Sequence, residues 1–374
     1  MSEFKKKVII TFLGNTYHDT RVVNLIDSLS QLNYNVSTIS FDWKTENFKS
    51  IIGKTSVYKL DKTKSSLSFY FNFIFKLVQQ LLKIKADLYF AEDIYTLPFV
   101  YFFAKKNNAK VFYNSREIYA HLAGLRNKSI VQKIISQIEK KFICKVDLVL
   151  VTGEMDAEYL RETYSIDNLF VLRNLPKYQK NIESIDLHKK LNIPSEQKII
   201  LYQGVILEGR GITKVIEVID KIPNTYFVII GEGEFKDKFI QLVEEKGVGN
   251  RVYFYGAVNH TELLPLTKGA DLGLALIENI SISYYYALPN KLFEYIMAEI
   301  PVLVSDLPQM KKIVEQYKVG ECISLENDNE IVTKIASMLS SEKKIIEYKA
   351  HASSAAKELN WQHEFKKFKE KYLN

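Results

Sequence analysis

The chain has 374 residues, which is enough for two or three domains with sizeable hydrophobic cores. Hydrophobic residues make up 47% of it and charged residues 25%, so a disordered chain and a collagen-like chain are both excluded. The two cysteines, Cys144 and Cys322, fit neither a disulfide framework nor a metal knuckle, and they predict a reducing, cytoplasmic compartment. The first residues show no signal-peptide pattern, and no apolar stretch is long enough to predict a transmembrane helix.

The positive charge is concentrated in the first half of the chain. Residues 1–190 hold 29 Lys and Arg against 19 Asp and Glu, whereas residues 191–374 hold 22 against 25. A basic half of this kind favours an anionic membrane, an anionic acceptor or a nucleic acid as partner, and it is equally compatible with an ordinary solvated surface. Because no nucleic-acid-binding module is recognisable, we expect no nucleic acid partner.

Short apolar runs alternate with longer helical patterns along the whole chain. This alternation predicts βαβ units and two doubly wound α/β domains, each with a parallel sheet of about six strands. The polar segment 177–197 is the expected linker, and the carboxyl edges of the two sheets should border a cleft where ligands bind. The expected strands are 8–12, 35–40, 88–91, 110–113, 148–152 and 169–172 in the first half, and 198–203, 226–231, 252–255, 272–276, 302–305 and 320–323 in the second.

The stretch 66–85 is unusually rich in aromatic residues. One interpretation is a helix that docks on a membrane surface and whose basic ends hold lipid phosphates. The other is a helix buried against the first sheet. The sequence leaves both open.

Several candidate site residues follow the strands of the first half. Gly14 permits a tight turn after the first strand, and His18 in the same loop is a candidate base. Asp93 follows the strand 88–91, and Arg116 and Glu117 follow the strand 110–113. We expect these residues at the edge where an acceptor would bind.

A glycine-rich loop follows the first strand of the second half. Gly204 ends this strand, and Gly209 and Gly211 flank Arg210. The guanidinium of Arg210 can donate two hydrogen bonds to a diphosphate, and glycine neighbours let the backbone approach the anion closely. Gly231 follows the next strand in a tight turn.

The most informative stretch is Ala287–Ser305. Pro289 predicts a helix that begins near Asn290, because proline is tolerated at a helix start. The free amides of the first turn would then form an anion site suited to phosphate, and Lys291 adds a positive charge beside it. Glu294 lies one turn later on the same face, where its carboxylate can accept two hydrogen bonds from a ribose diol.

Other catalytic patterns are missing from the sequence. No Ser-His-Asp or Cys-His arrangement has supporting context, no Walker motif is present, and the six histidines lack metal-ligand spacing. An Asp-x-Asp pair that could hold a divalent cation is also missing. We therefore expect neither a metal nor another cofactor.

The order of these motifs resembles that of glycosyltransferase family 4, a group of retaining enzymes with the GT-B fold. The segment Leu288–Pro301, LPNKLFEYIMAEIP, carries the most specific similarity, to the P-N-K-L-F-E-Y motif of polysaccharide-assembling members. The other segments that resemble the family are 19–22, 88–98, 113–117, 204–211, 229–235, 254–258 and, as a terminal helix that returns to the first domain, 359–373. Domains at 1–176, completed by 359–374, and at 198–358 are expected from this resemblance.

The resemblance implies transfer of a sugar from a nucleotide-sugar donor to an acceptor, with retention and without a metal. Carried over to this sequence, Glu294 would bind the donor ribose, while Arg210 and Lys291 would neutralise the leaving diphosphate. The resemblance further places Gly14, Gly204, Gly231, Gly256, Val258, Tyr286, Leu288, Pro289 and Asn290 around the donor.

The chain also departs from the family pattern. Tyr286 stands where many relatives have a second Glu that contacts the donor sugar, and Arg116 stands at the position of a histidine. Asn114 replaces an acid in the same segment, and Val205 replaces a basic residue.

The sequence thus predicts a hexosyltransferase-type enzyme of surface polysaccharide assembly. It would act on a glycan or lipid-linked acceptor from the cytoplasm, in peripheral contact with an anionic membrane on the inner face of the cell membrane. Two alternatives remain open at this point: a nucleotide-sugar epimerase of the same fold, and a catalytically degenerate subunit that assists another transferase.

Overall fold

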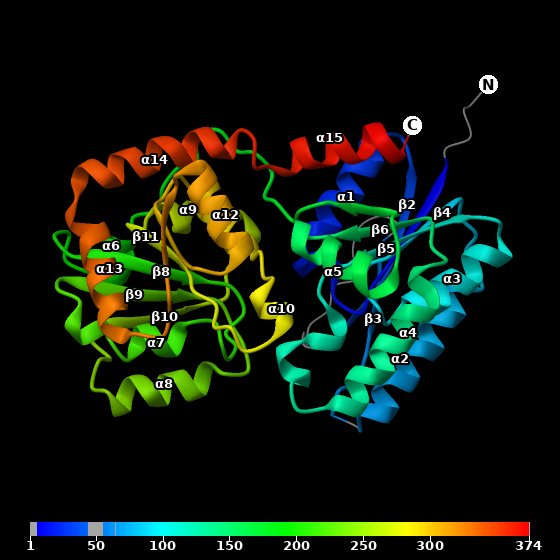
Figure 1. The fold of residues 1–374 in the computed structure, drawn as a ribbon, viewed down its shortest axis with the longest axis horizontal. Coiled ribbons are helices and arrows are strands. Elements are labelled where there is room, and N and C mark those ends of the chain that lie inside the picture. The colour runs from blue at the N-terminus through cyan, green and yellow to red at the C-terminus, as the bar shows by residue number, and fades with distance from the viewer. Residues whose placement is uncertain (1–5, 44–54, 64, 374) are drawn as a thin grey trace. The chain divides into compact units, whose positions relative to one another are not determined.

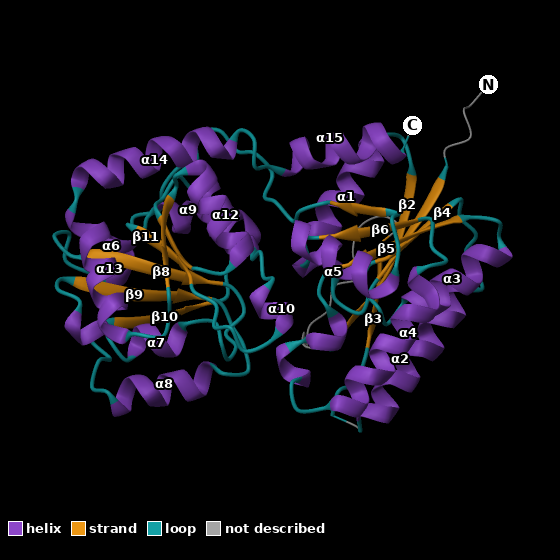
Figure 2. Ribbon diagram, in the orientation of Figure 1, coloured by secondary structure: helices purple, strands orange, loops and turns teal. Residues whose placement is uncertain are grey.

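The computed structural model describes residues 6–43, 55–63 and 65–373. The chain divides into two compact units, the first comprising residues 1–174 and 365–374 and the second residues 175–364. Each unit is an α/β layer structure built on one parallel sheet (Figures 1 and 2). The prediction of two doubly wound α/β domains is therefore confirmed.

The first unit contains a seven-stranded sheet in the order β3-β2-β1-β4-β5-β6-β7. All its pairs are parallel, and the strand order reverses between β1 and β4. The strands are β1 (Lys7–Thr11), β2 (Asn35–Asp42), β3 (Thr55–Lys59), β4 (Leu88–Ala91), β5 (Lys110–Ser115), β6 (Leu148–Val151) and β7 (Leu169–Val171). The expectation of about six strands missed β3, a short edge strand whose sequence TSVYK lacks a continuous apolar run.

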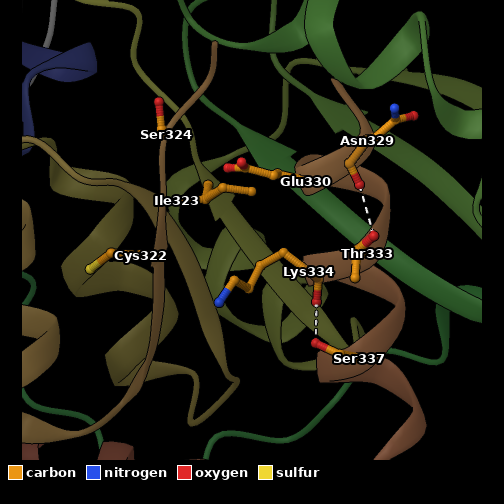
Figure 3. A pocket seen from close by; sticks show the side chains of 8 residues that line it. All are labelled: Cys322, Ile323, Ser324, Asn329, Glu330, Thr333, Lys334 and Ser337. Carbon is orange, nitrogen blue, oxygen red and sulfur yellow. Dashed lines mark hydrogen bonds between the residues drawn. The ribbon is translucent and has the colours of Figure 1, made fainter. Parts of the chain in front are cut away.

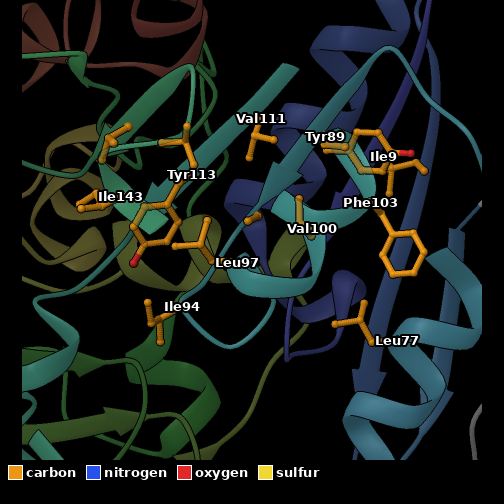
Figure 4. Close-up of a cluster of buried hydrophobic side chains, with 14 of the residues drawn as sticks. Ile9, Leu77, Tyr89, Ile94, Leu97, Val100, Phe103, Val111, Tyr113 and Ile143 are labelled. Carbon is orange, nitrogen blue, oxygen red and sulfur yellow. The ribbon is translucent and has the colours of Figure 1, made fainter. Parts of the chain in front are cut away.

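Helices pack on this sheet and enclose its core. The α-helices are α1 (Thr20–Gln31), α2 (Ser66–Leu81), α3 (Leu97–Lys106), α4 (Ser129–Ile143) and α5 (Glu154–Tyr164), and the short 3-10 helices are η1 (Thr16–His18), η2 (Tyr119–His121) and η3 (Ala123–Leu125). Figure 4 shows part of the core, in which Ile9, Tyr89, Val111 and Tyr113 come from the strands and Leu77 from α2. The strands are apolar on both faces because helices cover both.

Helix α2 combines features of both interpretations of the aromatic stretch. Phe69, Phe73 and Leu77 recur at helical spacing and are buried in the core. Leu67 and Phe71, on the opposite side, are 85% and 71% exposed. The helix is therefore anchored by one apolar face and leaves a second apolar face in solvent.

The second unit contains a six-stranded sheet in the order β10-β9-β8-β11-β12-β13, which reverses between β8 and β11. The strands are β8 (Lys198–Gln203), β9 (Thr225–Ile230), β10 (Val252–Gly256), β11 (Leu272–Ala275), β12 (Val302–Ser305) and β13 (Gly320–Ile323), which matches the predicted set within one residue at each end. Its helices are α6 (Leu187–Leu191), α7 (Ile212–Ile216), η4 (Ile219–Lys221), α8 (Lys236–Glu245), α9 (His260–Lys268), α10 (Ile282–Tyr285), α11 (Asn290–Met297), α12 (Pro308–Tyr317), α13 (Asp328–Ser340) and α14 (Glu342–Ala356).

The segment 177–197, which we expected as a linker, belongs to this second unit. It contains α6, whose Leu187 is fully buried, and Ile193 is nearly so. The amide of Ile185 donates a hydrogen bond to the carbonyl of Pro265 at 2.9 Å. The segment is mostly polar, so its few buried apolar residues did not indicate from the sequence that it packs on the second unit.

The terminal helix α15 (Trp361–Tyr372) returns to the first unit, as predicted. Phe368 is fully buried and packs against Phe112 and Phe170, with ring centroids 6.1 and 5.8 Å apart. The hydroxyl of Tyr34 donates to the carbonyl of Leu373 at 3.1 Å. In the part of the chain that the structure describes, no helix has the length and apolar character needed to cross a membrane.

Candidate active site

Three of the predicted glycines lie side by side at the carboxyl edge of the second sheet. Gly204, Gly231 and Gly256 lie at the ends of β8, β9 and β10. The amide of Gly231 donates to the carbonyl of Gly256 at 2.9 Å, and a Cβ on Gly231 would lie 1.9 Å from the carbonyl oxygen of Gly204. Gly231 also has a φ of 145°, which only glycine adopts without strain. This close approach leaves bare backbone beside the point where the strand order reverses.

Helix α11 begins at Asn290, as predicted, and brings Lys291 to this edge. Pro289 is its N-cap and adopts an extended conformation. Lys291 is 8% exposed, and its Nζ lies 3.4 Å from the ring centroid of Tyr202. A Cβ on Gly204 would lie 3.7 Å from that Nζ, so the amine is next to the glycine backbone.

Lys291 has no carboxylate ion-pair partner among the described residues. Burial lowers its pKa well below the usual value, and the positive charge of Arg210 lowers it further, while Glu294 partly opposes the shift. A buried cation of this kind gains stability from an incoming anion. The amides of the first turn of α11 add to the same field.

Arg210 lies in the loop between β8 and α7. Its guanidinium carbon lies 4.4 Å from the ring centroid of Tyr284 in a cation–π contact. Gly209 and Gly211 on either side have φ values of 73° and 72°, in the left-handed region. A Cβ on Gly211 would lie 2.4 Å from the Cβ of Leu276, so this loop lies against the end of β11.

Glu294 is held by a hydrogen-bond chain that the sequence did not reveal. Nε2 of Gln203 donates to Oε2 of Glu294 at 2.6 Å, and the hydroxyl of Thr267 donates to Oε1 of Gln203 at 2.7 Å. Burial raises the pKa of Glu294, while the bond from Gln203 and the proximity of His260 and Lys291 lower it, with a net rise. These two hydrogen bonds fix the carboxylate of Glu294 in one orientation, and selective binding of a diol requires a carboxylate fixed in this way. The sequence contained one indication of this role: Gln203 is a polar residue at the end of the buried run KIILYQ.

The remaining donor-side candidates follow β10 and precede α11. Val258 is half-buried in the loop after β10, and Asn290 is exposed at the start of α11. Tyr286 caps α10, and its carbonyl accepts a hydrogen bond from Nε2 of Gln309. Leu288 and Pro289 are half-buried between the two helices.

In the first unit Arg116 is the centre of an ion-pair cluster. It pairs with Asp19 at the start of α1 and, at 2.6 Å, with the fully buried Glu92 after β4. Burial lowers the pKa of Arg116, but the two carboxylates outweigh this effect and raise it overall. Nδ2 of Asn114 also donates to Glu92 at 2.7 Å. The sequence indicated Arg116 but missed Glu92 as its partner.

Asp93 is turned inward and bonds to backbone. It is 6% exposed, and it accepts hydrogen bonds from the amides of Leu13 at 2.5 Å and Thr96 at 2.8 Å. It thereby ties the loop after β1, which contains Gly14, to the start of α3. His18 and Glu117 are exposed at the same edge of the sheet. The structure therefore gives Asp93 a part in holding the loop.

A second surface of the second unit contains a polar groove of about 490 Å³ between β13 and α13 (Figure 3). Cys322, Glu330 and Lys334 are among its lining residues, and Nζ of Lys334 donates to Glu321 at 2.8 Å. None of the predicted site residues lines it. Across the described ranges 6–43, 55–63 and 65–373, no group of three or more His, Cys, Asp or Glu side chains is arranged to hold a metal ion.

Comparison with known protein families assigns both halves of the chain. Residues 183–359 match the model of glycosyl transferases group 1, and residues 19–174 match that of glycosyltransferase family 4. The chain is a family 4-like glycosyltransferase. This finding confirms the resemblance seen in the motif order.

Individual relatives extend the comparison. An uncharacterized glycosyltransferase of Methanocaldococcus jannaschii, MJ1607, is 27% identical over 161 residues, which are 42% of this chain and 40% of that protein. The match thus spans less than half of this curated relative. The structure of sucrose-phosphate synthase from Thermosynechococcus elongatus has a TM-score of 0.82 and 15% identity, and the alignment covers 99% of this chain and 98% of the synthase.

A third similar protein was solved with ligands. A mutant of S. aureus TarM, in complex with fondaparinux, α-GlcNAc-glycerol and UDP, has a TM-score of 0.72 and 14% identity, with 97% of this chain and 98% of TarM covered. At these identities the two structures establish a common fold. The family 4-like transferase is therefore of the GT-B type, as predicted.

Proposed function

We propose that this transferase moves a hexose-type sugar from a nucleotide diphosphate donor to a glycan or lipid-linked acceptor of a cell-surface polysaccharide. The observation that carries the proposal is the unpaired, buried Lys291 beside the bare backbone of Gly204 and the charge of Arg210. When the bond between the sugar and the diphosphate breaks, negative charge develops on the leaving phosphate. Two cations and the first amides of α11 would stabilise that charge.

The donor nucleotide would be bound through its ribose. The carboxylate of Glu294, oriented by Gln203, can accept hydrogen bonds from two ribose hydroxyls. The glycines at the ends of β8, β9 and β10 leave room for the nucleotide close to the backbone. The UDP bound in TarM supports a nucleoside diphosphate as the ligand class.

Transfer would proceed with retention and without a metal ion. The family resemblance supports retention, and the paired cations Arg210 and Lys291 support neutralisation of the diphosphate by side chains. The reaction would take place in the cytoplasm, where nucleotide sugars are substrates. The basic first unit would bring the enzyme to an anionic membrane surface on the inner face.

A non-catalytic role is the second candidate, and one observation favours it. Arg116 stands at the position where relatives have a histidine. Its guanidinium forms ion pairs with Asp19 and Glu92, and it cannot act as the base that a histidine could provide. Tyr286 likewise stands where relatives have a Glu. A binding subunit with these features would hold the nucleotide without cleaving it.

The test is a transfer assay followed by NMR. The full chain is incubated with nucleotide sugars and with glycan and lipid-linked acceptors, with and without EDTA, and the anomeric configuration of the product is determined. The proposal predicts a product with the configuration of the donor and equal rates with EDTA. An inverted product would contradict retention, and loss of activity in EDTA would contradict metal independence. Conversion of the donor without acceptor would indicate an epimerase, and binding without turnover would indicate the non-catalytic subunit.

A further inference from the structure

An apolar cavity of about 650 Å³ lies in the first unit, and none of the residues of the ion-pair cluster around Arg116 lines it. Its walls come from α2, α3, α4 and the loops after β4 and η2, and α2 and α4 flank α3 in the fold (Figure 1). Its volume falls within the range of about 300–1,000 Å³ that is usual for small-molecule sites. The lining includes Tyr70, Ile94, Tyr95, Phe99, Ile134 and Ile138.

The lining contains no charged side chain and is shaped by rigid groups. The rings of Tyr70 and Tyr95 stack with their centroids 6.0 Å apart, and Tyr95 packs edge-on against Tyr119. Branched side chains of α4 form another part of the wall. A cavity of this composition suits a flexible hydrocarbon chain and offers few of the hydrogen-bond partners that a sugar needs.

The helices around the cavity expose apolar side chains to solvent. Helix α2 leaves Leu67 and Phe71 in solvent, and α4 leaves Ile130 76% exposed. The sequence has no Asp or Glu between residues 62 and 86 or between residues 118 and 138, the two segments that contain α2 and the start of α4. The second segment carries Arg126, Lys128 and Lys133. Cations next to an apolar cavity complement a molecule with a hydrocarbon tail and an anionic head.

The cavity also adjoins the edge where the acceptor is expected. Ile94 and Tyr95, which line it, directly follow Asp93 after β4. Leu122 and Gly124 come from the segment that begins at Arg116 and Glu117. A chain in the cavity would therefore emerge close to the carboxyl end of the first sheet, where ligands of α/β folds bind.

We infer that this cavity binds the hydrocarbon chain of a lipid-linked acceptor whose anionic head lies among Arg126, Lys128 and Lys133. The inference rests on the proposed function, because it names the lipid part of the acceptor. Insertion of ordinary membrane phospholipid into the same cavity is the competing outcome.

Gly124 allows a side chain to be added at the wall of the cavity without a clash of its Cβ. It lines the cavity, and a Cβ built on it meets no atom within 4 Å. Gly124→Phe should therefore place a ring at the wall of the cavity while the fold persists. Leu67→Asp is the matched control, since Leu67 is 85% exposed on α2 and does not line the cavity.

The test titrates the full chain calorimetrically with geranyl phosphate and with farnesyl phosphate, which is one isoprene unit longer, below their micelle concentrations. Each methylene buried in the cavity strengthens binding about fourfold, so farnesyl phosphate should bind at least about tenfold more tightly. Gly124→Phe should abolish this dependence on chain length, and Leu67→Asp should preserve it. Equal affinities for the two probes, or an unchanged Gly124→Phe variant, would overturn the inference.

Binding to anionic phosphatidylglycerol vesicles at low salt distinguishes a lipid-linked acceptor from membrane phospholipid as the ligand of the cavity. Leu67→Asp should weaken vesicle binding, and Gly124→Phe should leave it unchanged. If Gly124→Phe instead weakens vesicle binding and farnesyl phosphate does not compete, the cavity takes membrane phospholipid and the inference is wrong. UDP binding is measured in the same samples. If the wild-type chain does not bind UDP, the proposed donor site is refuted, whatever the lipid result.

Discussion

Replacement of Lys291 by methionine should separate the stability of the free protein from its affinity for nucleotide. In the free protein the amine is buried without a carboxylate partner, and its pKa is depressed mainly by burial. Methionine keeps an apolar contact with the ring of Tyr202 but carries no charge to desolvate. We therefore expect Lys291→Met to fold at least as stably as the wild-type chain and to bind UDP weakly.

The expected magnitude follows from linkage. UDP at 100 times its Kd stabilises the wild-type fold by about 2.7 kcal/mol. Loss of a charge-assisted hydrogen bond costs about 1.5–3 kcal/mol, so the Kd of Lys291→Met should rise roughly 10- to 150-fold. At the same concentration UDP should then stabilise the variant by only about 0.3–1.4 kcal/mol.

The sign of the pH dependence gives a second readout. The unfolded chain keeps the Lys291 proton up to the ordinary pKa of 10.5, whereas the folded protein loses it at lower pH. Between these two values the unfolded state binds more protons, so this residue makes the free energy of unfolding rise with pH. A bound diphosphate raises the pKa of the amine, so UDP binding should take up a proton, and affinity should fall as pH rises through the folded-state pKa.

The assay is thermal unfolding with and without UDP, together with calorimetry in two buffers of different ionisation enthalpy. Lys246→Met removes an exposed lysine of the same unit and serves as control. It should retain the full shift with UDP and the proton uptake. An unchanged UDP affinity in Lys291→Met, or equal proton uptake in both variants, would refute the assignment of Lys291 to the diphosphate.

Three other substitutions test neighbouring parts of the account. Glu294→Ala should weaken UDP binding roughly 10- to 150-fold, because a charged hydrogen bond is lost, and calorimetry should show almost no effect on a 2′,3′-dideoxy nucleotide. Arg116→Met removes the ion-pair partner of the fully buried Glu92 and should lower the free energy of unfolding in urea by about 3–5 kcal/mol. Gly231→Ala places a Cβ 1.9 Å from a carbonyl oxygen at a φ of 145°, and it should lower the thermal midpoint and reduce UDP binding.

Each of these substitutions has its own control. An equal loss with normal and dideoxy nucleotide would place Glu294 away from the ribose. The double variant Arg116→Met/Glu92→Gln should recover part of the stability, and no recovery would contradict the role of the ion pair. Gly249→Ala, where a Cβ meets only Val243 at 3.9 Å, should be nearly neutral, so an equal effect at both glycines would contradict the argument from close approach.

Local sequence patterns predicted the fold well where burial is strong. Apolar runs such as KIILYQ are buried on both faces of a sheet and stand out from their neighbours, so their bounds agree with the structure. Pro289 likewise marked the start of α11, because the absence of an amide hydrogen is a local property. The edge strand β3 and the segment 177–197 escaped prediction, because a few apolar anchors in polar surroundings become meaningful only through contacts with distant residues.

The same distinction explains which site residues could be found. Arg210, Lys291 and Glu294 stand beside glycine or proline signals in the sequence. Gln203 and Thr267 are separated by 64 residues, and only the folded sheet brings them together below Glu294. Asp93 looked like an acceptor-side acid, yet its carboxylate is used by two backbone amides. Sequence position predicted the edge on which it lies but could not predict the direction of its side chain.

A nucleotide-sugar site in the second unit is tested by a thermal-shift and calorimetric screen of UDP, GDP, CMP and ADP and their common sugars against the full chain. At least one nucleoside diphosphate should stabilise the wild-type protein, and Lys291→Met and Glu294→Ala should each lose most of this stabilisation. No stabilisation by any nucleotide at millimolar concentration, or equal stabilisation of the wild-type chain and both variants, would contradict a nucleotide-sugar site at the edge of the second sheet.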